Sequence, residues 1–471
     1  MRKGRGVKWV WLVVGWLCGW GYAGAQSLTA QLETLLQQAT FLQTSEVGIA
    51  VYDLTDGQPL FRYQADKLYR PASVAKVITS VTALARLGEA YTFRTQLAYT
   101  GAIVNDTLQG NLYVIGHLDP EFSEDDLTGL AEAVEQAGIR HVAGSLVGDV
   151  TMTDSIYWGN GWSWDDAPEY FQPYLSPLML NRGVVDIAVK PSVKGTSPEV
   201  TVAPASDYYT VCNRSLSHTP AAGKLSVTRD WMHLGNELLI DGNAVRPYAC
   251  SLSLFASERF FLHTLRYQLR QRGIRLDSVA TGACPPEALL LAKVVRPLRE
   301  VLLRALKKSD NLSAEALFFH LGLQRKGALP VTFKDGREAL EQFMRQELQC
   351  DPKNYVLVDG SGLSPYDLVS PDLLVEYLKY AAADSALSSA FYTALPVAGI
   401  DGTLQHRMKS GRAFRNVHAK TGSVTGVSSL VGYVDRKSTG HRLAFAIINQ
   451  NVRNVAEARA FQNQLCELLA H

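Results

Sequence analysis

Residues 70–88 read RPASVAKVITSVTALARLG and predict a core helix that carries a serine and a lysine one turn apart. Pro71 suits the first turn of such a helix, and Gly88 suits its C-terminal end. Apolar side chains recur at helical spacing, at Val77, Ile78, Val81, Leu84 and Ala85. Ser73 and Lys76 stand at i and i+3, so their side chains share one face and come within reach of each other.

A lysine on the inward face of a helix is unusual. Burial disfavours the charged ammonium, so the pKa of Lys76 should fall toward the range that a general base needs. Ser-x-x-Lys is nevertheless common by chance, and taken alone it belongs more often to a packing helix than to a catalytic site. The rest of the chain has to decide between the two interpretations.

Residues 1–25 have the pattern of a secretory signal peptide. Four basic residues precede an apolar run from Val10 to Trp20, and Ala23-Gly24-Ala25 has the small-x-small form of a cleavage site. The alternative is a membrane anchor, but the run is shorter than the roughly 20 residues that span a bilayer. The residues before Cys18, Gly15-Trp16-Leu17, are not the set of small residues that precedes a lipidated cysteine. We expect cleavage near Ala25 and a secreted, periplasmic or otherwise extracytoplasmic protein.

The charge balance is close to neutral. The chain has 46 Lys and Arg against 45 Asp and Glu, and removal of the four basic residues of the signal leaves 42 (46 − 4) against 45. The sequence has no basic patch of the kind that would indicate nucleic-acid binding. The 47% apolar composition is ample for a core, and no later run is long enough to span a membrane.

The cysteines and histidines give no sign of a disulfide framework or a metal site. Cys212 and Cys250 flank a strand-rich region and are either paired or free, since both readings fit the sequence. The odd count leaves at least one cysteine unpaired after signal cleavage. No CxxC or HExxH spacing occurs, so we expect no metal and no cofactor. The five cysteines beyond the signal are Cys212, Cys250, Cys284, Cys350 and Cys466.

The chain predicts an α+β catalytic domain that is interrupted by a large insertion. A helix over 28–43 and a hairpin over 47–66, turning at Asp56-Gly57, come first. Short alternating runs with one helix over 127–139 then indicate one or two β-rich modules. Helical patterns resume near 290, and two C-terminal strands should complete the sheet begun by the hairpin. The expected division is 1–25 signal, 26–92 first catalytic part, 93–285 insertion and 286–471 second catalytic part.

Two further motifs change the interpretation of Ser73. Ser309-Asp310-Asn311 lies between two helices, where Asn311 or Ser313 would suffice as a helix cap. Lys420-Thr421-Gly422 lies on a predicted strand, where glycine lets a ligand approach the backbone. Each is weak alone. Ser-x-x-Lys, Ser-Asp-Asn and Lys-Thr-Gly in this order form the active-site triplet of penicillin-binding proteins and serine β-lactamases.

The spacing of the motifs distinguishes subfamilies. Ser73 and Ser309 are 236 positions apart (309 − 73), which leaves room for an insertion that a compact β-lactamase lacks. The chain resembles the D-alanyl-D-alanine carboxypeptidase/endopeptidase family S13, the class C low-molecular-mass penicillin-binding proteins. The resemblance implies a DD-peptidase/β-lactamase-like domain, an antiparallel sheet flanked by helices. The stretches that carry it are RPASVAKVITSVTAL, SDNLSAEAL, VDGSGLSPYDLVSP (358–371), LPVAGIDGTLQHRM (395–408) and AKTGSVTGVSSLVGYV.

The resemblance also implies roles for the site residues. Ser73 would be the nucleophile, neutral Lys76 the base, and Ser309 the relay of a proton to the leaving amine. Asn311 would hold Lys76 and the substrate amide, and Lys420 would keep Lys76 neutral and attract the substrate carboxylate. The remaining assignments are Thr421 and Gly422 for substrate binding, the backbone N–H groups of Ser73 and Ser423 for the oxyanion, and Asp310 as a structural residue.

Asp149, in GSLVGDVTMTD, matches an aspartate that can meet the amino group of the diamino acid in the family's peptide substrate. Thr151 and Thr153 depart from the pattern that follows it, so a strand-end or turn-forming aspartate remains an equal alternative. The implied partners are peptidoglycan stem peptides and β-lactams. Two other functions stay open at this point: a β-lactamase or esterase on the same scaffold, and a non-catalytic penicillin-binding scaffold of the cell wall.

Overall fold

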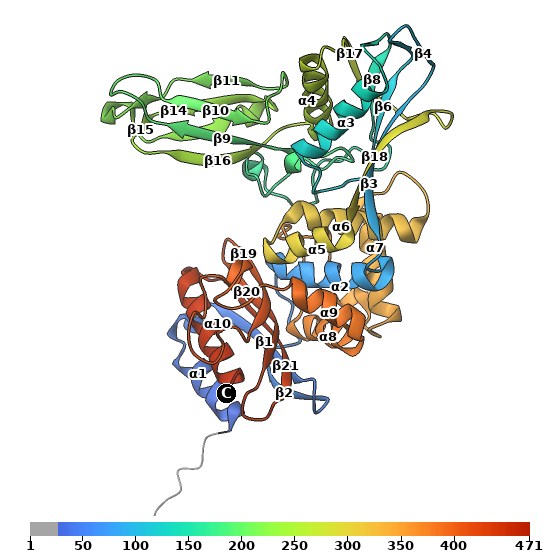
Figure 1. Ribbon diagram of the computed structural model, residues 1–471. Coiled ribbons are helices and arrows are strands. Elements are labelled where there is room, and N and C mark those ends of the chain that lie inside the picture. Colours follow the sequence, from blue (N-terminus) through green and yellow to red (C-terminus); the bar gives the residue numbers. More distant parts are fainter. Residues whose placement is uncertain (1–26) are drawn as a thin grey trace, which may run out of the picture.

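The computed structural model describes residues 27–471, so the predicted signal peptide and its cleavage site lie outside the described residues. Two parts stack on each other in Figure 1: a lower part that contains both ends of the described chain, and an upper part formed by its middle. Among residues 27–471 no helix combines the length and the apolar character needed to cross a bilayer.

The lower part is built on an antiparallel five-stranded sheet in the order β19-β20-β21-β1-β2. The predicted hairpin is confirmed, with Gly57 in the left-handed conformation at its turn (φ 70°). The C-terminal region supplies three strands to this sheet, where we expected two, because residues 418–435 fold back on themselves at Gly426. The strands are β1 (Glu46–Asp53), β2 (Gln58–Tyr63), β19 (His418–Val424), β20 (Val427–Asp435) and β21 (Arg442–Gln450).

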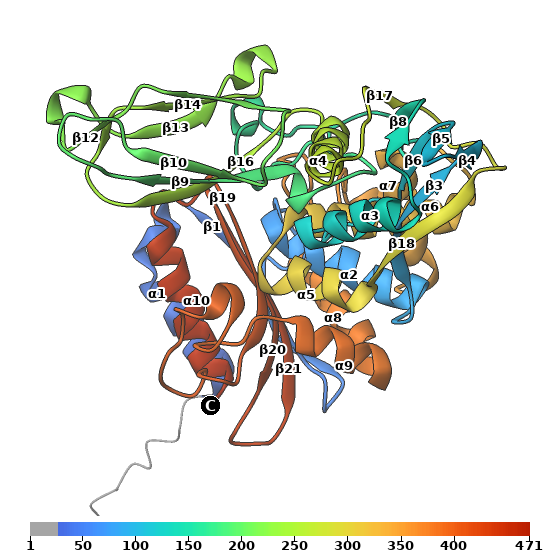
Figure 2. The same cartoon turned by 45° about the horizontal axis from the view of Figure 1, so that its top comes forward.

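Helices cover both faces of this sheet (Figures 1 and 2). On one face lie α1 (Leu28–Gln38) and α10 (Val455–Leu469). The expected helix over 28–43 ends at Gln38 and continues as a separate 3-10 turn, Thr40–Gln43. The other face carries a helical layer made of α2 (Ala75–Leu87), α5 (Leu298–Lys307), α6 (Asn311–Lys326), α7 (Phe333–Gln346), α8 (Pro371–Ala383) and α9 (Ser385–Ala394).

Helix α6 is the centre of the helical layer. Every residue from Asn311 to Gly322 is buried, which is the behaviour of a helix that is surrounded on all sides. Its N-cap is Asp310, whose side chain accepts a hydrogen bond from the Ser313 amide at 2.8 Å. The alternative interpretation, in which Asn311 or Ser313 only caps this helix, is therefore wrong, and the Asn311 side chain is left for other contacts.

The upper part contains two β-rich modules. The first is a mixed sheet in the order β17-β8-β6-β3-β18, packed against α3 (Glu124–Gln136), which confirms the helix expected near 127–139. A second helix, α4 (Ser257–Gln271), was missed, although Phe260, Phe261, Leu265 and Leu269 are buried at helical spacing. The strands of this module are β3 (Thr92–Tyr99), β6 (Leu112–Gly116), β8 (Ser145–Asp149), β17 (Ser278–Thr281) and β18 (Leu289–Pro297), with the small sheet β4 (Ala102–Val104), β5 (Thr107–Gln109) and β7 (His141–Val142).

The second module is a set of small sheets between residues 184 and 253, at the upper left of Figure 1. Cys212 and Cys250 lie in different sheets of this module and are both free, so the disulfide that the sequence left open is not formed. The strands are β9 (Val184–Lys190), β10 (Glu199–Ala203), β11 (Thr210–Asn213), β12 (Leu216–Ser217), β13 (Ser226–Arg229), β14 (Glu237–Asp241), β15 (Asn243–Ala244) and β16 (Tyr248–Ser253).

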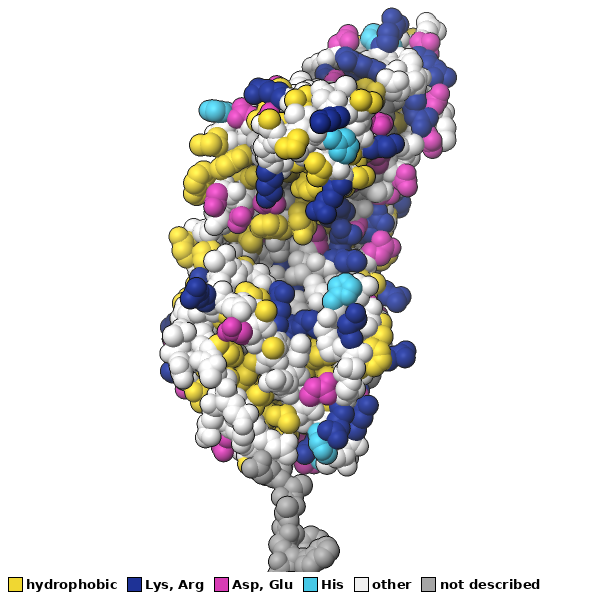
Figure 3. All heavy atoms as spheres, turned by 90° about the vertical axis from the view of Figure 1, so that its left-hand side faces the viewer, with side chains coloured by type: hydrophobic (Ala, Val, Ile, Leu, Met, Phe, Trp, Pro, Cys, Tyr) yellow, Lys and Arg dark blue, Asp and Glu magenta, His cyan; other side chains and the backbone are white. Residues whose placement is uncertain are grey.

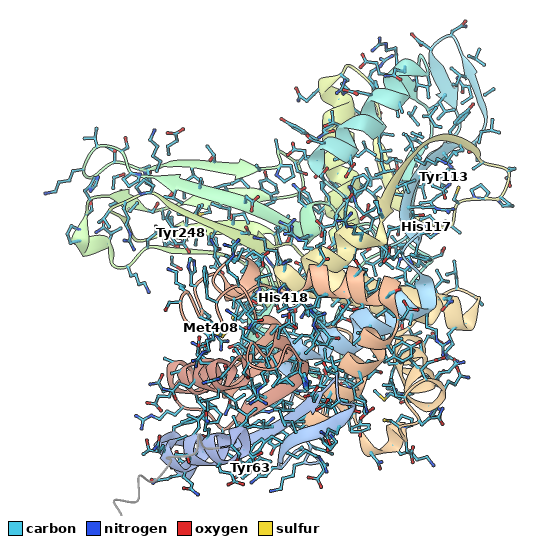
Figure 4. All side chains as sticks on the ribbon, turned by 60° about the horizontal axis from the view of Figure 1, so that its bottom comes forward. Tyr63, Tyr113, His117, Tyr248, Met408 and His418 are labelled. Carbon is cyan, nitrogen blue, oxygen red and sulfur yellow. The ribbon has the colours of Figure 1, made fainter. Side chains whose placement is uncertain are left out.

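The strand pairing suggests a later end for the insertion than residue 285. β18 pairs with β3 along its length, from Leu289 opposite Tyr99 to Pro297 opposite Thr92. Both connections between the two parts therefore run side by side through one strand pair. We propose that the insertion runs from Thr92 to Pro297. Figure 4 places His117 near this junction, His418 of β19 at the middle of the molecule, and Tyr63 of β2 at the far edge of the lower part.

Arg229 fastens the second module to the loop that leads into it. Its side chain is 1% exposed, and its guanidinium donates to the carbonyl oxygens of Ser253 (2.6 Å), Gly235 (2.9 Å) and Ala167 (3.1 Å). It also donates to the Tyr174 hydroxyl at 2.5 Å. One cation thus satisfies four acceptors from three separate segments.

We predict that Arg229→Leu lowers the free energy of unfolding by about 3 kcal/mol, because it leaves buried carbonyl groups without donors. Urea unfolding followed by tryptophan fluorescence measures this change. The exposed Arg246, changed to Leu, is the control and should alter stability by no more than about 0.5 kcal/mol. Equal unfolding midpoints for the two variants would contradict the role assigned to Arg229.

Candidate active site

Ser73 and Lys76 are placed by the turn that starts α2. Ser73 lies in a 3-10 turn, Ala72–Val74, which leads directly into the helix. Ala72 has a positive φ of 50°, a strained backbone conformation of the kind that accumulates at functional sites. Lys76 Nζ lies 3.0 Å from Ser73 Oγ, as the i, i+3 spacing predicts. Lys76 is fully buried, whereas Ser73 is only partly covered and lines a cleft.

The partners of Lys76 fix how its amine is oriented. Besides Ser73, Nζ contacts Asn311 Oδ1 at 2.7 Å and the Ser361 carbonyl oxygen at 2.7 Å. Both of these oxygens can only accept hydrogen bonds. A neutral amine has two N–H groups and one lone pair, so the two N–H groups go to Asn311 and Ser361. The lone pair is then left to face the hydroxyl of Ser73.

Burial lowers the pKa of Lys76 from its ordinary value to about 8, against the opposing effect of Asp359 and other carboxyl groups. About a tenth of Lys76 is therefore neutral at pH 7, whereas an exposed lysine is almost entirely charged at that pH. The geometry and the protonation state agree on one function for this side chain, which is to accept the proton of Ser73.

A second buried lysine, Lys420, lies on β19. Its Nζ donates to Ser309 Oγ at 2.8 Å and to the Thr421 carbonyl oxygen at 2.6 Å, and the side chain is fully buried. Burial and then the nearby Lys76 lower its pKa well below the usual range. Ser309 has a positive φ of 59°, so the turn before α6 presents its hydroxyl to Lys420.

Asn311 joins the catalytic part to the insertion. While Oδ1 accepts from Lys76, its Nδ2 donates to the Phe171 carbonyl oxygen at 2.7 Å. Phe171 belongs to the loop between β8 and β9. One of the amide N–H groups that we expected to meet the substrate is thus already engaged, and the orientation of the amide is fixed from both ends.

The KTG strand passes close to the nucleophile. A Cβ on Gly422 would lie 2.8 Å from the Pro71 carbonyl oxygen and 3.2 Å from the Ser73 amide nitrogen, so a larger residue would push β19 away. Thr421 donates through Oγ1 to Thr403 Oγ1 at 2.7 Å, and Ser423 is exposed and lines the cleft. The three motifs that the sequence singled out therefore converge around Ser73.

The cleft at Ser73 has a volume of about 820 Å³ and is bounded by both parts of the molecule. Figure 3 shows one face of the molecule hollowed between the upper and lower parts, with Lys and Arg side chains around the hollow. Lys308 lines the cleft, whereas its neighbour Lys307 is held by Asp401 at 2.7 Å. The charged residues of the cleft wall are Arg70, Asp166, Arg182, Arg304, Lys308 and Asp310.

Asp149 has a different environment from the one we expected. It ends β8, where Oδ1 accepts from the amide and the hydroxyl of Thr151 at 3.0 and 2.7 Å, and Oδ2 accepts from the Cys284 amide at 2.8 Å. It is not among the described residues that line the cleft. These contacts fit the alternative in which Asp149 is a strand-end residue. The wall of the cleft contains a different acid, Asp166.

A fourth segment, the loop 358–367, supports Lys76 and was missed as a functional element. Asp359 accepts hydrogen bonds from the backbone amides of Ser361 (3.2 Å), Gly362 (2.7 Å) and Ser364 (2.8 Å). This fixes the Ser361 carbonyl that receives Lys76. Gly362 has φ 75°, and a Cβ there would lie 2.0 Å from the Ala72 carbonyl oxygen. The glycines in DGSG were the available signal, since they allow this close approach.

Three buried carboxyl groups stand behind the lysine: Glu315, Asp359 and Asp367. Burial and then Asp359 raise the pKa of Glu315 to about 8 and that of Asp367 well above its usual range. Glu315 accepts from the Gly360 amide at 3.1 Å, and Asp367 accepts from the Val358 amide at 2.7 Å. Burial thus favours the neutral form of Glu315 and of Asp367, which limits the negative charge next to Lys76.

A possible metal-ligand cluster lies elsewhere. Within residues 27–471, Asp53, Asp56 and His441 bring ligand atoms within 4.8 Å of one another at the β1–β2 turn. Asp53 is already used there, because it accepts from the amides of Thr55 and Asp56 and contacts His441 at 2.8 Å. This cluster is accounted for by the turn and is not part of the Ser73 cleft.

Comparison with known proteins adds to this geometry. A curated D-alanyl-D-alanine carboxypeptidase of Actinomadura sp. (strain R39) is 29% identical over 442 residues, covering 90% of this chain and 80% of the relative. The D-alanyl-D-alanine carboxypeptidase DacB of Haemophilus influenzae is 29% identical over 419 residues, covering 85% of this chain and 84% of the relative.

A solved structure of penicillin-binding protein 4 from Haemophilus influenzae is 26% identical, has a TM-score of 0.82, and covers 93% of this chain and 99% of that one. A second structure of that protein, in complex with a β-lactam, is 25% identical with a TM-score of 0.77, and covers 94% and 100% of the two chains. The model of the D-Ala-D-Ala carboxypeptidase 3 (S13) family matches residues 28–471. The chain therefore belongs to the S13 family of peptidases.

Proposed function

We propose that the chain is a serine-type D-Ala-D-Ala carboxypeptidase that acts on peptidoglycan stem peptides through an acyl-enzyme on Ser73. The observation that carries the proposal is the contact of Lys76 Nζ with Ser73 Oγ at 3.0 Å, with two acceptor oxygens taking the N–H groups of the amine. The S13 family assignment agrees with this chemistry. DD-endopeptidase cleavage of cross-links is the same reaction with a longer leaving group, and we include it in the proposal.

In the acylation step, Ser73 attacks the carbonyl carbon of the penultimate D-alanine while Lys76 takes the hydroxyl proton. The negative oxygen that develops is stabilised by the backbone N–H groups of Ser73 and Ser423. Donors of this kind each contribute about 3 kcal/mol to transition-state stabilisation. The short separation of β19 from the Ser73 turn, which Gly422 permits, brings these two donors to the same carbonyl.

The leaving amine needs a proton, and Ser309 is the group that supplies it. Its hydroxyl receives a hydrogen bond from Lys420 at 2.8 Å, so a proton lost to the amine is replaced from Lys420, whose lowered pKa makes its protonated form a stronger acid. The Thr421 hydroxyl, which donates to Thr403 Oγ1 in the structure, turns to the terminal carboxylate of the substrate when it binds. The proton that Lys76 took from Ser73 then replaces the one that Lys420 gave up, so both amines return to their starting state. Water attacks the acyl-enzyme, Lys76 takes the proton of the water, and that proton passes to Ser73 Oγ as the acyl bond breaks.

The cleft suggests how the substrate is oriented. Arg70, Arg304 and Lys308 in its wall attract a negatively charged peptide end. Asp166 is the acid we propose, in place of Asp149, for an ammonium on the diamino acid. Burial and then Asp165 raise the pKa of Asp166 above its usual value, so a cationic partner would stabilise its charged form.

The S13 assignment favours a peptidase over the β-lactamase or esterase alternative, and the complete set of groups around Ser73 argues against a non-catalytic scaffold. β-Lactams would act as substrate mimics: they would acylate the same serine, and the resulting acyl-enzyme would hydrolyse slowly. We also propose that the protein works outside the cytoplasm, where peptidoglycan is found. The signal-like residues 1–25 support this location.

Ser73→Ala and Lys76→Ala are each expected to reduce penicillin labelling and D-alanine release by at least about 10³-fold, because nucleophile and base act as one unit. Labelling with a fluorescent penicillin and mass spectrometry of products from monomeric and cross-linked muropeptides measure both activities. Lys437→Ala, at an exposed lysine, is the control and should behave as the unchanged protein. Persistent labelling of the Ser73 variant would refute the mechanism.

The acylation rate should rise with pH through about 8, since only neutral Lys76 can accept the proton. Asp359 raises the pKa of Lys76, so Asp359→Asn should move the midpoint of this profile to lower pH. It should also lower the plateau rate about tenfold or more, because the Ser361 carbonyl loses its support. Stopped-flow acylation by a chromogenic β-lactam measures the midpoint of the pH profile and the plateau rate. Asp277→Asn, at an exposed aspartate, is the control and should change neither. A midpoint that stays or rises would contradict this account.

Asp166→Ala should raise KM for muropeptides with a free amino group on the diamino acid by about tenfold and leave acylation by a small β-lactam unchanged. The neighbouring Asp165 is exposed and is not among the described residues of the cleft wall, so Asp165→Ala is a matched control. Acetylation of the substrate amine should remove the difference between the two variants. An equal loss in both variants, or a loss that survives acetylation, would refute the assignment.

A further inference from the structure

A second groove adjoins the Ser73 cleft and plays no part in the mechanism above. It has a volume of about 520 Å³ and lies where the loop 158–174 meets the 3-10 turn Trp231–His233 of the second β-rich module. Half of the eight tryptophans of the chain line it. Its lining is Trp158, Gly159, Asn160, Gly161, Trp162, Ser163, Trp164, Ala167, Gln172, Tyr174, Trp231, Met232 and Leu234.

The outer side of the groove presents aromatic surface to solvent. Trp164 is 70% exposed, and its ring centroid lies 5.2 Å from that of Trp231, with an angle of 39° between the ring planes. Met232 and Leu234 are exposed beside this pair. Large apolar side chains that cluster at the surface of a protein mark a binding site for a ligand or for another macromolecule.

The chemistry of the lining is neutral. None of the described residues that form the groove carries a formal charge, so it holds no partner for a phosphate, a carboxylate or an ammonium group. What it does offer, besides indole rings, are amide and hydroxyl groups, from Asn160, Ser163 and Gln172. Aromatic faces combined with neutral hydrogen-bonding groups suit a ligand with an apolar face and many hydroxyls.

A buried acceptor in this lining lacks a partner. Gln172 is 1% exposed, and its Nε2 donates to the Ser163 carbonyl oxygen at 2.7 Å. Its Oε1 has no hydrogen-bond partner among residues 27–471, and the same holds for the indole N–H of Trp158. Buried polar groups are nearly always paired, because each unpaired one costs about 1–3 kcal/mol. The residues that line the groove therefore contain one donor and one acceptor that no described residue satisfies.

The groove is adjacent to the catalytic cleft. Ser163 lines both cavities, and Trp162 donates through Nε1 to Asp359 Oδ2 at 2.9 Å, in the loop that supports Lys76. A ligand in the groove therefore lies beside a substrate in the cleft. A stem peptide of four residues spans at most about 14 Å when extended, which sets the reach between the group at its amino end and the scissile bond.

We propose that this tryptophan groove binds an amino-sugar ring of the glycan strand to which the stem peptide is attached. The C–H groups on the face of a pyranose ring pack on the negative face of an indole, and sugar hydroxyls and acetamido groups both donate and accept hydrogen bonds. The inference rests on the proposed function, because the glycan reaches the groove as part of the same substrate. The groove thereby favours glycan-linked peptides over free ones.

The test compares D-alanine release from a disaccharide-linked stem peptide and from the same peptide without sugars. The unchanged protein should have a KM about tenfold lower for the sugar-linked peptide. In the double variant Trp164→Ala/Trp231→Ala the two KM values should be equal, with turnover of the free peptide and β-lactam acylation as before. Tyr248→Ala, an exposed aromatic on β16 of the same module (Figure 4), is the matched control and should keep the difference.

Direct binding gives a readout that is independent of catalysis. An N-acetylglucosamine trisaccharide should shift the tryptophan emission of the unchanged protein in a saturable way, and the double variant should lose this response. Equal KM values for both substrates in the unchanged protein, or a preference that survives in the double variant, would overturn the inference. Self-association that the double variant abolishes, seen by sedimentation without any saccharide response, would assign the groove to a second copy and overturn it as well.

These outcomes also separate the two proposals. If neither peptide is hydrolysed and β-lactam does not label Ser73, the proposed function fails, whatever the trisaccharide does. If both peptides are hydrolysed equally well and the trisaccharide gives no response, the proposed function stands and only the sugar site fails.

Discussion

The Lys76 amine is buried beside two oxygen atoms that can accept hydrogen bonds but cannot donate them. The rest of the site depends on this constraint. Lys76 is fully buried, and its N–H groups are taken by Asn311 Oδ1 and the Ser361 carbonyl oxygen. An ammonium in that position carries a desolvation penalty, which lowers its pKa to about 8. The neutral amine then has its lone pair directed at Ser73, so one packing arrangement sets both the charge and the direction of the base.

Maintaining this arrangement requires four segments that are distant in the chain. Helix α2 carries Ser73 and Lys76, α6 begins with Asn311, β19 carries Lys420, and the loop 358–367 supplies the Ser361 carbonyl. The insertion takes part as well, since the Phe171 carbonyl orients the Asn311 amide. Domain architecture and chemistry are therefore coupled: the β-rich insertion is both a wall of the cleft and a support for the base.

The sequence predicts those features that rest on local spacing. The Ser73–Lys76 contact follows from helical geometry, and some strands of the insertion, such as β9 and β10, follow from their alternation. Features that depend on packing between distant segments were harder to predict. The carbonyl of Ser361 and the carboxyl groups behind Lys76 have no signal beyond the glycines of DGSG, and the choice between Asp149 and Asp166 depends on which loop reaches the cleft. Helix α4 was missed despite its spacing, because it lies in a region dominated by short strands.

Titration of Lys76 itself shows whether a neutral amine faces Ser73. NMR of the lysine ¹³Cε signals, with the Lys76 signal assigned by its absence in Lys76→Ala, reports its protonation state as a function of pH in the intact protein. We expect a transition near pH 8, more than two pH units below that of an ordinary lysine. A Lys76 signal that stays in the ammonium form above pH 10 would contradict the account, because no neutral base would then be available to Ser73.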